Sequence, residues 1–188
     1  MLLSLIVTAC LLQATLISGD TISVTNGGPW GDWGMTEYCP PGTYARGFNL
    51  LVEKPQGPLD DTALNGIELY CSDLTTIFKK GTISSTKGSW GGWTGERWCP
   101  SGYLTSFSLR VEQPIGIGDD TAANNIQFRC SDQTILEGNG GVWGGWGSWS
   151  GACQLGICGI KTRVEKAQGA DDDDTSLNDV KFECCEIW

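Results

Sequence analysis

The feature that most constrains this chain is a motif that occurs three times. The copies are the stretches 60–71, 119–130 and 173–184 of the 188 residues. Each begins with Asp-Asp-Thr, continues to Asn and a short alternating run, and ends in cysteine. Repeats of this kind are typical of architectures in which copies of one supersecondary unit bury their apolar faces against one another.

Other features recur in the same order within each unit. A pair of tryptophans with two residues between them is followed by a cysteine and then by a segment that ends in Val-Glu. The tryptophan pairs lie at 30–33, 90–93 and 143–146, the cysteines are Cys39, Cys99 and Cys153, and Val-Glu lies at 52–53, 111–112 and 164–165. We therefore expect one domain, residues 20–188, with repeats at about 20–80, 81–132 and 133–188.

Alternation with period two predicts short strands. Phe48, Leu50 and Val52 fall on one face of a segment whose opposite face carries Asn49, and residues 107–112 repeat the pattern. No segment shows ten or more residues of helical periodicity, and 27 glycines and 7 prolines mark turns. The sequence therefore predicts an all-β protein.

A unit of this size forms a small sheet that cannot bury its apolar face alone. Three such sheets cover one another around a central axis. The expected architecture is a three-sided β-prism with approximate threefold symmetry, and the alternatives are a small propeller or a trefoil.

The first residues are expected to direct secretion. Residues 2–17 are uncharged and mostly apolar, and the small residues Ser18 and Gly19 follow. This pattern is typical of a signal peptide, here residues 1–19, although the basic segment that usually precedes the apolar run is missing. A signal anchor is the alternative, but about 20 apolar residues are needed to span a bilayer.

The cysteines predict a disulfide framework. Of nine cysteines, Cys10 lies in the signal segment, so eight remain and would form four bridges. Equivalent positions in the repeats give the pairs Cys39–Cys71, Cys99–Cys130 and Cys153–Cys184, and Cys158–Cys185 is left. Exchange of partners between the adjacent Cys184 and Cys185 remains open for the last two pairs. The chain has no histidine and no Cys-x-x-Cys, so neither a metal site nor a cofactor is expected.

The net charge of −10 disfavours nucleic acid and anionic membrane surfaces as partners. Without histidine or a free thiol, catalysis would rest on carboxylates such as Glu112, Asp119 and Asp120. Glycoside chemistry needs two carboxyls about 5–9 Å apart, one of them kept protonated. The same residues recur in every unit, however, and Asp, Thr and Asn stabilise turns by bonding nearby backbone. We favour the turn-forming interpretation for these repeated residues. For the four aspartates at 171–174 we favour a solvated loop over calcium binding, because the spacing of an EF-hand is absent.

Nine tryptophans suggest stacking on sugar rings. Six belong to the repeated pairs, which we interpret as packing residues. Function is expected where the repeat is broken, as at Trp98, which corresponds to Ala152 in the third unit, and at Trp149, which has no counterpart. The longer link after Cys71, with Lys79, Lys80 and Lys87, is another such place.

Several of these motifs resemble the vitelline membrane outer layer protein 1 (VMO-I) family. They are Gly-Pro-Trp-Gly-Asp-Trp at 28–33, Asp-Asp-Thr-Ala-Leu-Asn-Gly-Ile at 60–67, Phe-Ser-Leu-Arg-Val-Glu at 107–112, the stretch 118–125 and the adjacent cysteines at 184–185. The resemblance implies a β-prism I fold of three Greek-key sheets, which the family shares with jacalin-like lectins. It also implies a secreted structural protein of the kind first known from the outer layer of the egg's vitelline membrane.

The implied partners are extracellular matrix or egg-coat proteins, among which the acidic charge favours basic ones, and glycans. The avian family member is associated with weak transfer activity on N-acetylglucosamine oligosaccharides. A carbohydrate-binding protein or weak glycosyltransferase is therefore the alternative function. The family offers no motif of catalytic residues, so no residue is assigned to catalysis. We keep Glu112, Asp119, Asp120, Trp98 and Trp149 as candidate ligand contacts.

Overall fold

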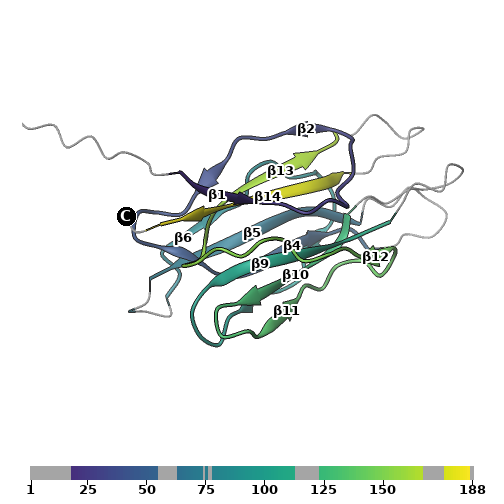
Figure 1. The fold of residues 1–188 in the computed structure, drawn as a ribbon. Helices are drawn as coiled ribbons and strands as arrows, with labels where there is room; N and C mark the ends of the chain where they lie inside the picture. The colour runs from purple at the N-terminus through teal and green to yellow at the C-terminus, as the bar shows by residue number, and fades with distance from the viewer. Residues whose placement is uncertain are drawn as a thin grey trace, which may run out of the picture.

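The computed structural model describes residues 18–54, 63–73, 75, 78–112, 123–166 and 176–186. Within these ranges the chain forms strands, turns and loops, and no helix is long and apolar enough to cross a membrane. The strands make three antiparallel sheets, A, B and C, which lie as three walls around a common interior (Figure 1).

Each sheet is built on two long neighbouring strands that come from one sequence unit. Sheet B contains β4 (Tyr44–Val52) and β5 (Leu64–Ser72), sheet C contains β9 (Leu104–Val111) and β10 (Ala123–Cys130), and sheet A contains β13 (Ile157–Val164) and β14 (Leu177–Cys185). Each of these pairs is joined antiparallel along most of its length. The repeated alternating segments therefore form the walls, as the sequence predicts.

The shorter strands do not stay with their own unit. In sheet B the strand order is β6-β5-β4-β7, and β8 also pairs with β4. The three short strands β6, β7 and β8 come from the second repeat. The short strands are β1 (Ser18–Ile22), β2 (Asp32–Trp33) and β3 (Glu37–Tyr38) in sheet A, β6 (Gly81–Ile83), β7 (Gly92–Trp93) and β8 (Arg97–Trp98) in sheet B, and β11 (Ile135–Glu137) and β12 (Gly145–Trp146) in sheet C. The expectation that each unit forms its own sheet is therefore wrong for the short strands. The short strands of each unit add to the sheet whose two long strands come from the preceding unit. Sheet A is completed by the first unit, and this closes the prism.

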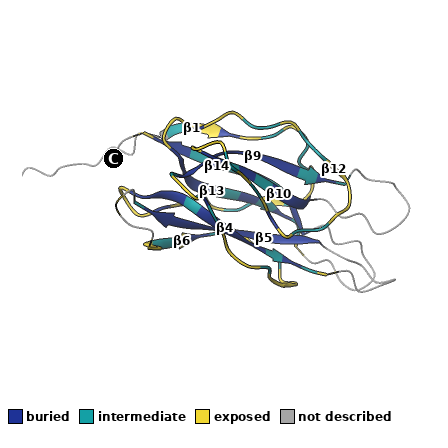
Figure 2. Cartoon of the chain, turned by 90° about the horizontal axis from the view of Figure 1, so that it is seen from below, coloured by how far each residue is buried: buried dark blue, intermediate teal, exposed yellow. Residues whose placement is uncertain are grey.

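The inner faces of the sheets form one core (Figure 2). Four phenylalanines meet near the axis: the ring centroid of Phe128 lies 4.8 Å from that of Phe48 and 5.3 Å from that of Phe182. Phe107 lies 4.8 Å from Phe182. All four side chains are fully buried, so each sheet contributes at least one ring to the same cluster.

The predicted outward position of Asn49 is correct, yet Asn49 is buried. Its Oδ1 accepts the backbone N–H of Gly95 at 2.9 Å, from the segment that the second unit adds to sheet B. Ser108 is buried in the same way, and its hydroxyl donates to the carbonyl of Gly147 at 2.8 Å. Strand addition from the next unit therefore covers part of the outer face.

Three disulfides join the cysteine pairs expected from the repeat, Cys39–Cys71, Cys99–Cys130 and Cys153–Cys184, and the fourth joins the remaining pair, Cys158–Cys185, so Cys184 and Cys185 do not exchange partners. The first three connect different sheets. The backbone N–H of Cys99, for example, donates to Arg46 O in sheet B, while its sulfur is bonded to Cys130 in sheet C. Cys39 joins sheets A and B in the same way.

The third bridge completes the set. Cys153 donates its N–H to Thr105 O in sheet C and is bonded through sulfur to Cys184 in sheet A. The three bridges therefore form a closed ring around the prism, A to B to C to A. The fourth, Cys158–Cys185, joins neighbouring strands within sheet A.

Candidate functional site

The first tryptophan of each pair is exposed to solvent. Trp30, Trp90 and Trp143 are 55%, 50% and 57% exposed. Each precedes a glycine with positive φ, and a Cβ on that glycine would lie within about 2.4 Å of the backbone that ends β13, β4 or β9. The glycine thus lets the chain lie against the strand end while the tryptophan remains outside. The interpretation of all six paired tryptophans as packing residues is wrong for these three.

The second tryptophan of each pair lies on the outer face of its sheet beside a cationic side chain. Lys181 Nζ is 4.6 Å from the Trp33 ring centroid, Lys87 Nζ is 5.3 Å from that of Trp93, and the Arg110 guanidinium is 5.9 Å from that of Trp146. Such contacts are attractive because the cation faces the negative face of the indole. Trp93 is nonetheless 42% exposed, whereas Trp33 and Trp146 are less so.

The two candidates that break the repeat lie on different sheets. Trp98 stacks on Tyr70 in sheet B with ring centroids 5.2 Å apart, and its indole N–H donates to Glu96 at 2.9 Å. Trp149 lies against the outer face of sheet C, where the Arg129 guanidinium is 4.6 Å from its ring centroid. Both are half-buried and both are engaged by neighbours. The structure does not bring them together into one site.

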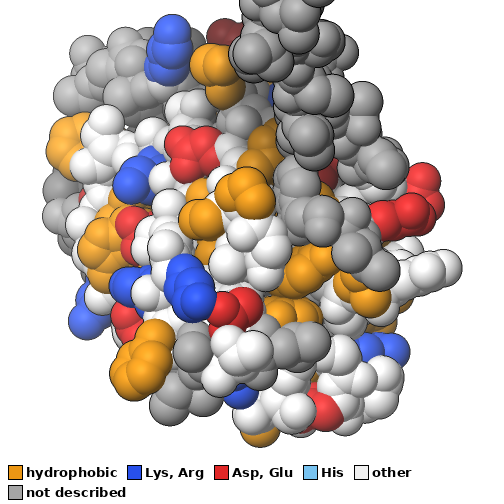
Figure 3. Space-filling view, turned by 90° about the vertical axis from the view of Figure 1, so that its left-hand side faces the viewer, with side chains coloured by type: hydrophobic (Ala, Val, Ile, Leu, Met, Phe, Trp, Pro, Cys, Tyr) orange, Lys and Arg blue, Asp and Glu red, His pale blue; other side chains and the backbone are white. Residues whose placement is uncertain are grey.

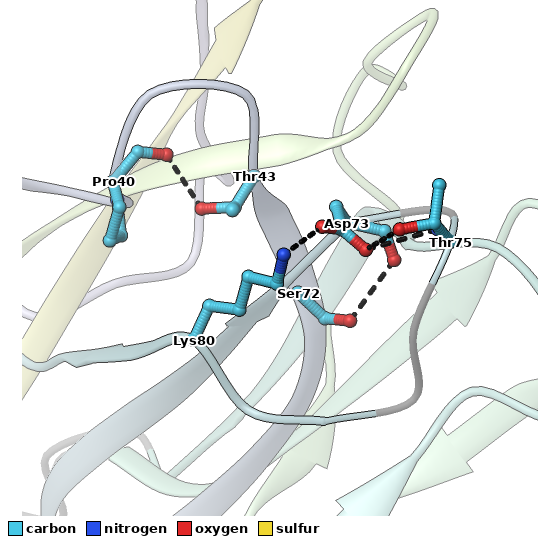
Figure 4. A network of polar contacts seen from close by, with 6 residues as sticks. All are labelled: Pro40, Thr43, Ser72, Asp73, Thr75 and Lys80. Atoms are coloured by element: carbon cyan, nitrogen blue, oxygen red, sulfur yellow. Dashed lines mark hydrogen bonds and ion pairs between the residues drawn. The ribbon is translucent and has the colours of Figure 1, made fainter.

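The lysines of the long link after Cys71 contact other residues of this chain. Lys80 forms an ion pair with Asp73, whose carboxylate also accepts the hydroxyl and the backbone N–H of Thr75 (Figure 4). Lys79 lies 3.7 Å from Glu96, and Lys87 lies 3.9 Å from Glu68. These lysines therefore stabilise sheet B and its link. The end of the prism at the left of Figure 1, seen face on in Figure 3, shows acidic and basic side chains interspersed with apolar ones.

Of the candidate carboxylates, Glu112 is half-buried just after β9, and Asp119 and Asp120 lie outside the described residues, as do the aspartates at 60–61 and 171–174. The backbone of the equivalent glutamates has a structural role. Glu53 and Glu165 donate their N–H groups to the carbonyls of Ala63 and Ser176 at 2.9 and 2.8 Å. Over the part of the chain that the structure describes, no group of three or more His, Cys, Asp or Glu is placed to hold a metal ion.

No sequence pattern singles out Asp179. Burial raises the pKa of its carboxyl, against the opposing effects of a hydrogen bond from Val180 N–H and the charges of Lys181 and Arg163. Its Oδ1 accepts the Val180 N–H at 2.8 Å, just as Asn125 Oδ1 accepts the Ile126 N–H at 2.9 Å at the same position of the second unit. An uncharged amide would therefore satisfy the backbone here as well.

We expect Asp179→Asn to be more stable than the natural protein at neutral pH. A raised folded-state pKa means that the natural protein is stabilised where the carboxyl is protonated and loses this stability as the pH rises through the folded pKa. The gain in melting temperature should therefore shrink as the pH falls toward the ordinary carboxyl pKa. Thermal unfolding measured across this pH range tests the expectation. Asp179→Ala, which also removes the bond to Val180, is the control and should not show the same gain.

A groove lies where the three sequence units meet beside the exposed Trp93. It has a volume of about 710 Å³ and is lined by Val52, Glu53 and Lys54 after β4, by residues 91–94 around β7, and by Asn139. These residues place a carboxylate, an ammonium group and an amide around an aromatic face. This groove was not predictable from the sequence, because Trp93 belongs to a repeated pair and the repetition suggests a packing residue.

Three antiparallel sheets around one core define a β-prism fold. The fold is similar to Calystegia sepium agglutinin, with a TM-score of 0.54 and 17% identity over 89% of this chain and 97% of that one. It is also similar to a mannose-specific jacalin-related lectin from Morus nigra in complex with mannose, with a TM-score of 0.52 and 15% identity over 90% and 96% of the two chains. At these identities the likeness shows the fold alone, which is the predicted β-prism I.

The chain belongs to the vitelline membrane outer layer protein I family, whose sequence model matches residues 20–187. The human vitelline membrane outer layer protein 1 homolog is 52% identical over 166 residues, which are 87% of this chain and 82% of the relative. The mouse homolog is 49% identical over the same shares. The resemblance seen in the sequence motifs is confirmed. Family membership and four disulfides are consistent with an extracellular protein.

Proposed function

We propose that this protein is secreted and acts as a structural component of an extracellular layer. The observation that carries the proposal is the ring of three disulfides between sheets, which resists separation of the walls in an oxidising environment. The names of the human and mouse relatives point to the same role. Residues 1–19 would act as the signal peptide and the remainder as the mature domain.

Expression of the full chain in secretory cells tests this proposal. The protein is expected in the medium with an amino terminus at or near Asp20, and its resistance to protease should fall sharply when the disulfides are reduced. Mass spectrometry of the intact secreted chain and timed digestion with and without reductant give these readouts. Retention in the cells with residues 1–19 still attached would contradict secretion.

In this structural role the protein would bind matrix or coat proteins, and its net charge of −10 favours basic ones. Such association is expected to weaken as salt increases, because charge attraction between exposed groups is screened. Binding of the purified protein to extracellular matrix fractions at increasing ionic strength measures this dependence. Binding that does not change with salt would exclude charge as its basis.

Carbohydrate recognition is the second candidate, and the exposure of Trp30, Trp90 and Trp143 favours it. Exposed aromatic rings are apolar surfaces with specific geometry, and three related copies would give a multivalent ligand a gain in avidity. A glycan array probed with the natural protein and with the triple alanine variant tests this role. Glycosyl transfer by Glu112, Asp119 and Asp120 is the catalytic form of the same candidate. New chain lengths in the mass spectrum of incubated N-acetylglucosamine oligomers, lost on substitution of these three residues, would support it.

A further inference from the structure

At the groove beside Trp93, a threonine stands where the corresponding places on the other two sheets have glycine. Thr94 follows Trp93, whereas glycine follows the equivalent tryptophans as Gly34 and Gly147. The three backbones are placed alike: Thr94, Gly34 and Gly147 donate their N–H groups to the carbonyls of Leu50, Thr162 and Leu109 at 2.9, 2.8 and 2.9 Å. The difference therefore lies in the Thr94 side chain and in the neighbouring residue that this side chain displaces.

On sheets A and C a linker side chain packs against the glycine. A Cβ on Gly34 would lie 2.1 Å from Thr86 Oγ1, and one on Gly147 would lie 2.4 Å from the Asn26 side chain. A side chain at either position would therefore have to displace the linker residue that packs there. Asn26 is held in this position by donating its amide to Leu109 O at 2.9 Å.

Asn139 is the equivalent linker residue on sheet B. Two residues after Asn26, Gly28 donates its N–H to the carbonyl of Asn178, and two residues after Asn139, Gly141 donates its N–H to the carbonyl of the equivalent Asn124. Here the Thr94 side chain occupies the space. Asn139 instead donates to Thr94 O at 3.2 Å and accepts from Arg97 Nη2 at 2.5 Å. Asn139 is thus held at the rim, and the groove stays open beside it.

We propose that this groove binds an oligosaccharide, with Trp93 as the platform for a sugar ring and Thr94 as the residue that keeps the site open on sheet B. The proposal rests on the carbohydrate-recognition candidate and gives it a location. A pyranose ring has an apolar face that suits an aromatic platform and hydroxyl groups that need both donors and acceptors. The lining supplies both, since Glu53 is an acceptor, Lys54 is a donor and the Asn139 amide is both.

The platform is held in place before the ligand arrives. Lys87 lies over the Trp93 ring at 5.3 Å and is itself 3.9 Å from Glu68, yet 42% of Trp93 remains exposed. Asn139 is fixed at the rim by Arg97 and the backbone of Thr94. A rigid site loses less conformational freedom on binding. The volume of about 710 Å³ lies within the range of roughly 300–1,000 Å³ that small-ligand sites occupy.

Titration of the ¹⁵N-labelled mature protein with triacetylchitotriose and with mannotriose tests the proposal by NMR. We expect the indole signal of Trp93 and the amide signal of Asn139 to shift, while the indole of Trp146, the equivalent residue on sheet C, stays in place. Trp93→Ala should weaken binding at least about tenfold, and Trp146→Ala should leave it within about twofold. Both variants must keep the natural melting temperature to within a few degrees.

Thr94→Gly gives a second and independent measurement. It removes no group that the sugar would stack on, but it allows Asn139 to pack as Asn26 does, so it should close the groove and abolish binding. Saccharide binding that survives both Trp93→Ala and Thr94→Gly would overturn this site while leaving carbohydrate recognition intact elsewhere. Absence of binding to either saccharide and to the glycan array would overturn both.

Discussion

Replacing Cys99 and Cys130 together by alanine is expected to lower the free energy of unfolding by about 3–4 kcal/mol. The bridge closes a loop with a sequence separation of 31 residues, and its removal restores that loop's freedom in the unfolded chain. In the folded protein the substitution also removes the bond from Cys99, which directly follows strand β8 of sheet B, to Cys130 in sheet C. Denaturant unfolding of the natural and doubly substituted proteins gives the difference directly.

Cys158 and Cys185 provide the matched control. Their sequence separation, 27 residues, is similar, so the loss of loop-closure entropy should be similar as well. They join neighbouring strands that are already paired within sheet A. Substitution of this pair should therefore leave the walls in register, whereas loss of Cys99–Cys130 should also increase amide exchange in β8 and β10. Equal exchange in the two variants would contradict the role of the ring in holding the sheets together.

Truncation of Phe128 to alanine is expected to destabilise the protein by about 3–5 kcal/mol. The side chain is fully buried, and its ring centroid lies 4.8, 6.4 and 5.3 Å from those of Phe48, Phe107 and Phe182. These rings come from all three sheets, so the cavity would open where the walls meet. Chemical denaturation monitored by tryptophan fluorescence measures the loss.

Two further variants separate packing from general hydrophobicity. Phe128→Leu introduces the residue that the first unit has at the equivalent position, Leu69, and should cost clearly less than alanine. Phe78, which is 73% exposed, should tolerate alanine with a change within about 0.5 kcal/mol. A similar loss at Phe78 and Phe128 would refute the central role of the phenylalanine cluster.

The fold was predictable from the sequence because the information was local and present three times. The period-two runs around Phe48 and Phe107 specify a buried and an outer face, and their repetition requires three such faces to meet. The spacing of the cysteines likewise suggested which of them would be paired. What local pattern could not specify was the wall to which each two- or three-residue strand would add. Pairing of such short strands depends on the tertiary position of the preceding sheet rather than on their own sequence.

The candidate site was less predictable for a related reason. Repetition suggested packing, yet Trp30 and its two equivalents are exposed because the glycine that follows each of them fits against a strand end. Trp98 and Trp149 were correctly singled out as departures from the repeat, but the structure places them on different sheets. The informative departure was Thr94, a single side chain in place of glycine. Its effect depends on Asn139, from a segment more than forty residues further along the chain.

Sheet A is completed by strands from opposite ends of the described chain, with β1 hydrogen-bonded along β14. Thr21 and Glu183, whose side chains are 2.7 Å apart, are separated by 162 positions in the sequence. During synthesis the first strand must therefore wait for the last pair of long strands before it can dock, and such distant pairing slows folding. The three sheets thus follow one another in a closed cycle, and the chain ends interrupt this cycle within sheet A. A circularly permuted chain that starts between β5 and β6, with residues 20 and 186 joined by a short flexible linker, should build the same three walls.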